Sequence, residues 1–249
     1  MSDLILDDVC ISYGQHHAVC HLSGAFKKGS LTAIAGSNGA GKSTLVKAIM
    51  GELPLTRGRI KRGSLRNQDI AYLPQTADIN RQFPISVYDL VSLGTWTETG
   101  AFGRLSDSSQ ANIAKALQRV AVTGVEQRQI QSLSAGQFQR ILFARLLLQD
   151  AQVIILDEPF TAVDEKTTLD LIHLIKQWHQ EGRTVIAVLH DIEQIQQYFP
   201  STLYLARESV FWGDSKSAFS NTHRAQARIL TDYWDNSTQN KEINEVALP

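Results

Sequence analysis

The sequence has few cysteines, no long apolar run and no excess of charge of either sign. Cys10 and Cys20 are too few for a disulfide framework and form no C-x-x-C pair, which favours a reducing compartment. No apolar run approaches the roughly 20 residues of a membrane-spanning helix, so any work at a membrane would be done from the water side. The segment Met1 to Asp8 has no basic flank and does not indicate a secretion signal. The 24 Lys and Arg nearly balance 25 Asp and Glu, and we expect no nucleic-acid partner.

Short β-branched runs alternate with helical periodicity along the 249 residues, which predicts an α/β fold with a largely parallel sheet. The predicted strands are Leu4 to Tyr13, Leu31 to Ala35, Ile70 to Leu73, Val153 to Leu156, Thr184 to Leu189 and Thr202 to Leu205.

The character changes between Gln75 and Ala151, where apolar residues recur at helical spacing and predict an inserted helical segment. Its helical runs are Val87 to Leu93, Ile113 to Val122 and Ile141 to Leu148. Ser86, and either Ser106 or Asp107, stand where N-caps are expected. We predict a loop over Gly94 to Gly103 and a poorly ordered polar tail over Asn236 to Pro249.

A glycine-rich segment follows the run Leu31 to Ala35 and precedes a helix-forming run, Leu45 to Met50. Its spacing, G-x-x-x-x-G-K-S, predicts a phosphate-binding loop in which backbone N–H groups and a helix N-terminus hold an anion. Lys42 would reach the β- and γ-phosphates, and the Ser43 hydroxyl would bind Mg²⁺. The predicted nucleotide-binding residues are Gly36, Ser37, Asn38, Gly39, Ala40, Gly41, Lys42, Ser43 and Thr44.

Two adjacent carboxylates, Asp157 and Glu158, end the predicted strand that starts at Val153. Ligands gather at the carboxyl ends of parallel strands, so both acids are expected beside the nucleotide. Because successive strand residues point to opposite sides, we expect different roles for them. Asp157 would bind Mg²⁺ through water, and Glu158 would polarise the water that attacks the γ-phosphate. The alternative, a merely solvated strand end, is weakened by the phosphate loop.

Three more residues stand at strand ends: Tyr13, Gln75 and His190. The His190 imidazole could reach the γ-phosphate or the attacking water, although a lone histidine is more often structural. The Gln75 amide could contact Mg²⁺ or water and report the ligand to the helical insertion. The Tyr13 ring could stack on adenine, or it could be an ordinary core or edge tyrosine.

A second anion site is predicted where Leu133, Ser134, Ala135, Gly136 and Gln137 precede a helix over Phe138 to Leu148. It offers a hydroxyl, close backbone approach and a helix N-terminus, but no lysine. Because the helical insertion carries it away from the phosphate loop, we expect two copies of the chain to exchange these loops across a two-fold axis.

These motifs, in this order, resemble the ATP-binding cassette (ABC) family over about nine tenths of the chain. The resemblance implies an ATPase that binds ATP and Mg²⁺, with Tyr13 against adenine, Gly36 to Thr44 as the Walker A loop and Gln75 as the Q-loop. It implies the signature in Leu133 to Gln137, Walker B in Val153 to Glu158, the D-loop in Thr161 to Asp164 and the switch histidine in His190. Ser43, Gln75 and Asp157 would hold Mg²⁺, and Glu158, His190 and Gln75 would be catalytic. Ala135 departs from the usual glycine and would restrict a backbone that needs positive φ.

The implied fold is a P-loop NTPase core with a mostly parallel sheet, an N-terminal antiparallel β region and an inserted helical sub-domain. We expect a cassette over residues 1–235, the sub-domain over about 76–150 and a polar tail over 236–249. Phe160 after Pro159, and the run Gly182 to Asp191, resemble the ATPase subunits of bacterial importers for zinc, manganese or iron.

That resemblance implies a homodimer on the cytoplasmic face of the plasma membrane, docked to an integral membrane permease and served indirectly by an extracytoplasmic metal-binding protein. Thr76 to Thr99 would form much of the docking surface. Phe83, Tyr88 and Trp96 could be exposed there, or Phe83 and Tyr88 could pack inside the helical lobe.

We do not expect His16, His17 and His21 to be zinc ligands, because no cysteine or acid stands near them at metal-site spacing. Two alternative functions stay open. A soluble ABC ATPase of DNA maintenance or translation usually has two cassettes or long coiled coils, which are not found here. A P-loop kinase or GTPase would not explain Leu133 to Gln137 or His190.

Overall fold

The chain divides into two compact units in this computed structural model, which describes residues 3–14, 16–100 and 103–246. Unit 1 comprises Met1–Ser64 and Ile186–Pro249, and unit 2 comprises Leu65–Val185. Strand β7 (Thr184–Val188) runs through the division and contributes to both units. Within the described ranges, no helix is both long and apolar enough to cross a membrane.

Unit 1 contains a separate antiparallel sheet with the strand order β2-β1-β4. Its strands are β1 (Leu4–Tyr13), β2 (His16–Phe26) and β4 (Arg57–Lys61). Strand β4 carries charged side chains that pair with β1: Arg59 and Lys61 with Asp7 at 3.2 and 3.1 Å, and Arg57 with Asp8 at 2.7 Å. Strand β4 is therefore joined to β1 by ion pairs at the edge of the sheet and has no alternating apolar pattern.

The second sheet of unit 1 has the order β7-β3-β8-β9. Strand β3 (Leu31–Ala35) pairs in parallel with β8 (Ser201–Ala206), and β8 pairs antiparallel with β9 (Glu208–Asp214). Strands β3 and β7 are buried along their whole length, as expected for parallel strands covered on both faces.

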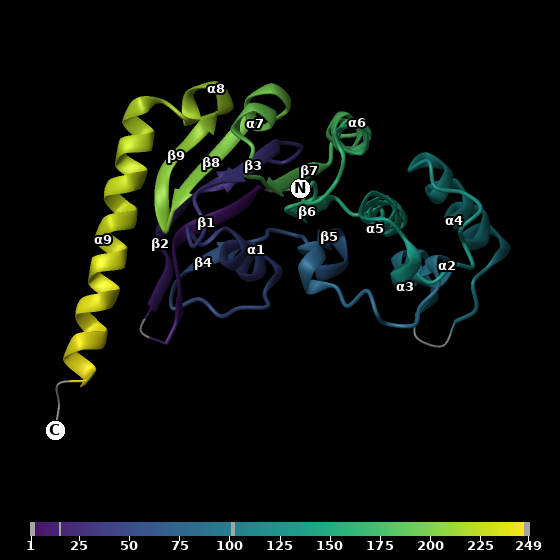
Figure 1. Ribbon diagram of the computed structural model, residues 1–249, viewed down its shortest axis with the longest axis horizontal. Coiled ribbons are helices and arrows are strands. Elements are labelled where there is room, and N and C mark those ends of the chain that lie inside the picture. Colours follow the sequence, from purple (N-terminus) through teal and green to yellow (C-terminus); the bar gives the residue numbers. More distant parts are fainter. Residues whose placement is uncertain (1–2, 15, 101–102, 247–249) are drawn as a thin grey trace. The chain divides into compact units, whose positions relative to one another are not determined.

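The helices of unit 1 are α1 (Lys42–Met50), α7 (Ile192–Tyr198), α8 (Ser215–Ala218) and α9 (Asn221–Val246). Figure 1 shows α9, in yellow, running along β8 and β9, where Ala227 joins Ala206 and Val210 in a buried cluster. The polar segment from Asn236 continues α9 as far as Val246, which differs from the expected poorly ordered tail. Residues 247–249 lie outside the described residues.

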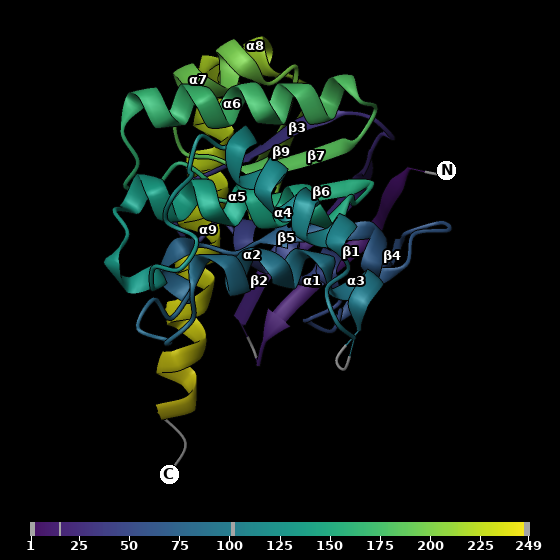
Figure 2. The same cartoon turned by 90° about the vertical axis from the view of Figure 1, so that its right-hand side faces the viewer.

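Unit 2 has β5 (Ile70–Leu73) parallel to β6 (Val153–Asp157), in the strand order β5-β6-β7. Its helices are α2 (Val87–Ser92), α3 (Trp96–Thr99), α4 (Asp107–Arg119), α5 (Ala135–Gln149) and α6 (Glu165–Gln180). Helix α5 contacts both α2 and α4, as Figure 2 also shows. The predicted helical character between Gln75 and Ala151 is thus confirmed.

The predicted N-caps Ser86 and Ser106 are confirmed: each hydroxyl accepts a hydrogen bond at 3.1 Å from a backbone N–H, of Asp89 and Ser109 respectively. The predicted loop over Gly94 to Gly103 is wrong in its first half, where a 3-10 turn (Leu93–Thr95) leads into α3. Residues 101–102 lie outside the described residues.

The predicted fold class, an α/β fold with a mostly parallel sheet and a separate antiparallel region, is confirmed. Strands β1, β3 and β5 have the predicted bounds, β6 and β7 differ by one residue at one end, and β8 is one residue longer at each end. Strands β2, β4 and β9 were not predicted from the sequence. In β2, register shifts against β1 break the alternation of buried and exposed residues that a strand prediction needs.

Candidate nucleotide-binding site

The predicted phosphate loop lies between β3 and α1 in unit 1. Gly39 and Gly41 have φ of 79° and 92°, a region that favours glycine. Gly41 is the N-cap of α1, where no side chain caps the helix and no acidic residue stands in the first turn. The first N–H groups of α1 and its positive dipole end can therefore act on an anion.

The Lys42 ammonium lies within this loop and donates hydrogen bonds to the Gly36 and Ser37 carbonyl oxygens at 3.0 and 2.9 Å. Lys42 as a whole is only 6% exposed. A buried ammonium is costly unless it is compensated, and a phosphate is the ligand whose charge would do so. This placement agrees with the predicted role of Lys42.

Backbone contacts from β2 and from the β8–β9 turn hold the loop. A Cβ atom on Gly41 would lie 2.3 Å from the Ala18 carbonyl oxygen, so only glycine fits there. The Arg207 N–H donates to the Ala40 carbonyl at 3.0 Å, and the Arg207 carbonyl accepts from the Cys20 N–H at 2.7 Å. The shape of the loop thus depends on contacts that are distant in the sequence.

Tyr13 and His190 are both exposed residues of unit 1. Tyr13 ends β1 and is 51% exposed, which excludes a core position and leaves the alternative of an edge tyrosine open. His190 lies in the short turn between β7 and α7. The neighbouring Leu189 N–H donates to the Ile34 carbonyl at 3.0 Å, which places this turn beside the strand that leads into the phosphate loop.

In unit 2, the Gln75 amide donates a hydrogen bond from Nε2 to Glu158 Oε1 at 3.0 Å. The register of the parallel strands explains this contact: Leu73 pairs with Leu156, and Gln75 and Glu158 each follow two residues later. Thr161 Oγ1 donates to Glu158 Oε2 at 3.3 Å. The structure therefore brings together two of the predicted catalytic residues.

The two adjacent carboxylates have different environments. Asp157 ends β6 and is 1% exposed, whereas Glu158 follows the strand with φ of 51° and is half-buried. Positive φ is unfavourable for a residue with a Cβ atom and often accompanies functional sites. The expectation that the two acids differ in role is consistent with this geometry.

The signature segment forms the start of α5. The Ser134 hydroxyl accepts from the Gln137 N–H, and the Gln137 side chain accepts from the Ser134 N–H, both at 3.2 Å, which makes a capping box. Ala135 is the first helical residue and is not among the described non-glycine residues with positive φ. Its methyl group is therefore compatible with the backbone, contrary to the expected restriction.

Asp164, predicted to lie in the D-loop, is the N-cap of α6. Its carboxylate accepts from the Thr167 N–H and from Thr167 Oγ1, both at 2.9 Å. These hydrogen bonds lower the pKa of Asp164 below its ordinary value. A Cβ atom on Gly136 would lie 3.3 Å from Asp164 Oδ2, so the signature helix α5 and the capped end of α6 lie in close contact.

Residues that the sequence analysis missed connect the segment after Gln75 to α5. Thr76 Oγ1 donates to Gln139 Oε1 at 3.0 Å, and the Gln139 residue is 2% exposed. Arg81 donates to the Leu133 carbonyl and lies 4.8 Å from the Phe138 ring centroid. Leu133 belongs to the predicted signature, Phe138 begins a predicted helix and Thr76 begins the predicted docking segment, whereas no sequence signal singled out Arg81 or Gln139.

The histidines near the N-terminus lie in different surroundings. His17 Nδ1 is hydrogen-bonded to Ser12 Oγ at 2.9 Å, and its ring lies 5.5 Å from that of Trp234. For His21, the absence of a partner at metal-site spacing along the chain did not predict its spatial neighbours, which are Cys10, Cys20 and Asp8. Strand pairing brings them together, which residue spacing along the chain could not show.

The predicted docking segment exposes two of its three aromatic residues. Phe83 and Trp96 are 58% and 53% exposed, and Leu93 of the same segment is 40% exposed. Tyr88 is half-buried. The alternative that Phe83 packs inside the helical lobe is therefore wrong.

Comparison with known proteins places these features in a family. The family described as ABC transporter matches residues 19–161. A manganese transport system ATP-binding protein of Listeria monocytogenes is 35% identical over 86% of this chain and 91% of that protein. A zinc transport system ATP-binding protein of Treponema pallidum is 35% identical over 89% and 85% of the two chains.

The fold is also similar to that of a solved ABC transporter. A solved inward-facing ABC transporter, assigned to the metal-chelate type, matches with a TM-score of 0.79 and 26% identity over 90% of this chain and 87% of that chain. The phosphate loop, the paired Gln75 and Glu158 and these similarities agree: the chain belongs to the ABC transporter family.

Proposed function

We propose that this chain is the ATP-hydrolysing subunit of an ABC importer for a divalent metal ion: zinc, manganese or iron. Relatives named for manganese and zinc transport support the cargo. The main support for hydrolysis is the hydrogen bond between Gln75 and Glu158, because it connects a carboxylate at a strand end to the start of the helical segment. The reported relatives are transport proteins and give no support to a role in DNA maintenance or translation.

ATP would be held by the phosphate loop, with the buried Lys42 ammonium on its β- and γ-phosphates and the α1 N-terminus adding backbone N–H donors. The exposed Tyr13 ring would stack on adenine. The loop residues Gly36 to Thr44 would make the remaining contacts.

The donor set fits Mg²⁺, because Ser43, Gln75 and Asp157 offer hydroxyl, amide and carboxylate oxygens. When bound, Mg²⁺ would neutralise charge on the phosphates. Glu158 would accept a proton from the attacking water, oriented by its hydrogen bonds from Gln75 and Thr161. His190 would contact the γ-phosphate from the turn after β7.

A second copy of the chain would complete the site in trans with Ser134, Ala135, Gly136 and Gln137. The support is the exposed Ser134 at the start of α5, whose first turn contains no acid. Asp164 would position this region through its cap on α6. Two ATP molecules would thus close a homodimer, and release of product would reopen it.

The dimer would act at the cytoplasmic face of the plasma membrane, docked to permease subunits, while an extracytoplasmic protein delivers the metal. We propose the cassette over residues 1–235, with a helical sub-domain over about 76–150 and the remainder as a C-terminal tail. The exposed Phe83, Leu93 and Trp96 support a docking surface on the helical segment.

Glu158→Gln tests the hydrolytic role. The amide keeps the shape of the side chain but cannot accept a proton, so phosphate release should fall by about 10²-fold or more. ATP binding should survive and ATP-bound dimers should accumulate, measured by nucleotide binding and size-exclusion chromatography.

Glu165→Gln, which changes an exposed acid in the first turn of α6, serves as the matched control and should hydrolyse ATP normally. Unchanged turnover in Glu158→Gln would remove Glu158 from its role.

A further inference from the structure

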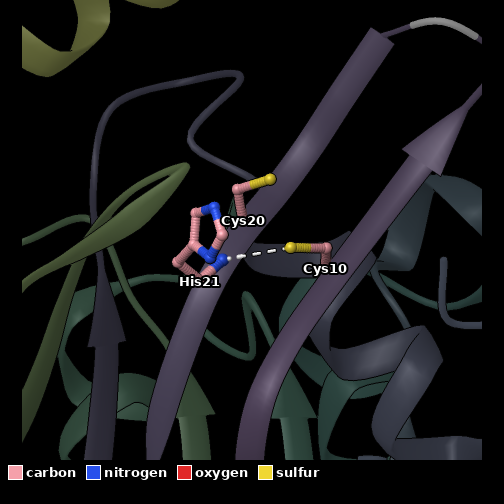
Figure 3. A group of neighbouring side chains, drawn as sticks. All are labelled: Cys10, Cys20 and His21. Carbon is pink, nitrogen blue, oxygen red and sulfur yellow. Dashed lines mark hydrogen bonds between the residues drawn. The ribbon is translucent and has the colours of Figure 1, made fainter. Parts of the chain in front are cut away.

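Three metal-ligating side chains gather outside the phosphate loop, on the antiparallel sheet of unit 1. They are Cys10 on β1 and Cys20 and His21 on β2. One ligand atom from each lies within 4.8 Å of the other two. Figure 3 shows the Cys10 sulfur pointing from β1 toward His21 on the neighbouring strand β2, with Cys20 beside His21 on that same strand.

A β-bulge between β1 and β2 brings these three residues together. Val9 pairs with Leu22 and Ile11 with Val19, so the single residue Cys10 stands opposite two residues, Cys20 and His21. In a regular strand these two neighbours would point to opposite faces of the sheet. The bulge removes this constraint, and the His21 N–H donates to Cys10 Sγ at 3.2 Å.

The backbone at the bulge is unusual for its residue type. His21 has φ of 49°, a left-handed conformation that residues with a Cβ atom rarely adopt. Unfavourable conformations of this kind are retained where the surrounding structure requires them, often at ligand sites.

A carboxylate orients the imidazole. Asp8 Oδ1 lies 3.0 Å from His21 Nδ1, and Asp8 Oδ2 is held by Arg57 Nε at 2.7 Å. Metal-binding histidines commonly donate one ring N–H to a carboxylate in this way, which leaves the other nitrogen to bind the metal. With Nδ1 bonded to Asp8, Nε2 is the ligand nitrogen.

The three candidate ligands differ in their exposure to solvent. Cys10 and Cys20 are 6% and 4% exposed, whereas the His21 side chain is 55% exposed. The two sulfurs are thus shielded from water, and the histidine side is open to an ion arriving from solvent.

We propose that Cys10, Cys20 and His21 bind one Zn²⁺ ion, with Asp8 orienting the imidazole. Two thiolates and one imidazole suit Zn²⁺, whereas Mn²⁺ and Mg²⁺ prefer oxygen ligands. None of the three proposed ligands is a residue proposed for nucleotide binding or hydrolysis, and the site goes beyond the proposed function. A disulfide between the cysteines would need neither the histidine nor its carboxylate, so the cluster as a whole favours a metal.

The test uses the full chain, reduced and stripped of metal without nucleotide, in excess Mg²⁺ that occupies oxygen-rich sites. Zn²⁺ titrated against a competing chelator should bind at one equivalent per chain. Co²⁺ as a spectroscopic substitute should give a thiolate-to-metal charge-transfer absorption, and Mn²⁺ should not displace it. Failure to bind Zn²⁺, or binding without the Co²⁺ absorption, would overturn the proposal.

Variants assign the ligands. His21→Asn removes the imidazole but places a residue that tolerates positive φ at the bulge, and Zn²⁺ affinity should fall at least about tenfold. The Cys10→Ala and Cys20→Ala double variant should lose the Co²⁺ absorption. His16→Asn, exposed at the start of the same strand, is the matched control and should bind as the wild type does.

Thermal melts followed by circular dichroism establish that each variant folds. Should the cysteine double variant fail to fold, the His21→Asn titration still tests the proposal, because wild-type Zn²⁺ affinity in His21→Asn would contradict it. Two thiols that close into a disulfide in air, in a chain that binds no Zn²⁺ when reduced, would show a redox pair and also overturn it.

Discussion

Glu158 illustrates how much of this site depends on single residues. Its φ of 51° turns the chain away from β6, while hydrogen bonds from Gln75 and Thr161 reach both of its carboxylate oxygens. Such conformations cost of the order of 1–3 kcal/mol. Two other side chains therefore hold the carboxylate in one orientation. The proposed role of Glu158 as a proton acceptor requires such a fixed orientation toward the attacking water.

Ala135 gives a prediction at this scale. Because it is the first residue of α5 and does not need positive φ, Ala135→Gly should not improve ATP hydrolysis. It should lower the free energy of unfolding by about 0.5–1 kcal/mol, as glycine does in helices. Urea denaturation and an ATPase assay measure the two quantities. A clear gain in turnover would show that the working loop needs a conformation that alanine resists.

At the scale of elements, α5 connects the motifs of unit 2. Thr76 bonds to Gln139 on this helix, Arg81 bonds to Leu133 just before it, and Gly136 in its first turn lies against the α6 cap. Arg140 of α5 also forms a 2.6 Å ion pair with Asp170 of α6. A change at Gln75 can therefore reach the signature through directly bonded groups.

The α6 cap gives a pH-dependent prediction. Hydrogen bonds from Thr167 hold the pKa of Asp164 below its ordinary value in the folded chain. The carboxylate therefore contributes stability above its unfolded pKa, and this contribution is lost as pH falls through the lower folded pKa. Asp164→Ala should lower Tm at neutral pH, and its difference from the wild type should shrink on acidification.

Asp164→Asn is the control, since asparagine also caps helices but carries no charge. The side chain at position 164 should then make no pH-dependent contribution to the stability of the Asp164→Asn variant. Thermal denaturation of the three proteins across a pH series provides the measurement. A Tm difference between wild type and Asp164→Ala that stays constant as the pH falls would contradict the assigned cause.

At the scale of the whole molecule, exposed apolar residues are the surface proposed for docking to a permease. Phe83→Ala with Trp96→Ala should weaken co-purification with the cognate permease by at least about tenfold, because buried aromatic residues dominate such contacts. ATP binding by the isolated chain should be unchanged, since neither residue belongs to the proposed nucleotide site.

Tyr233→Ala is the matched control, because Tyr233 is an equally exposed aromatic residue, at 62%, but lies on α9. Retention of the permease by the double variant, or equal loss with Tyr233→Ala, would contradict a docking role for Thr76 to Thr99. Membrane extraction and affinity purification give the readout.

The sequence by itself determined the motifs and most of the parallel strands. G-x-x-x-x-G-K-S and the Asp157–Glu158 pair are local patterns whose chemistry depends on residue type and spacing, and continuous apolar runs identified β3, β6 and β7. The caps Ser86 and Ser106 were equally local, because a cap bonds to an N–H only three residues away.

Only the tertiary structure decided which distant residues meet. The parallel register of β5 and β6 joins Gln75 to Glu158, and a bulge between β1 and β2 joins Cys10 to Cys20 and His21. Strand β4, with one apolar residue among charged neighbours, exists through its pairing with β1. Register, bulges and edge pairing are set by contacts between separate segments, and no spacing within one segment encodes them.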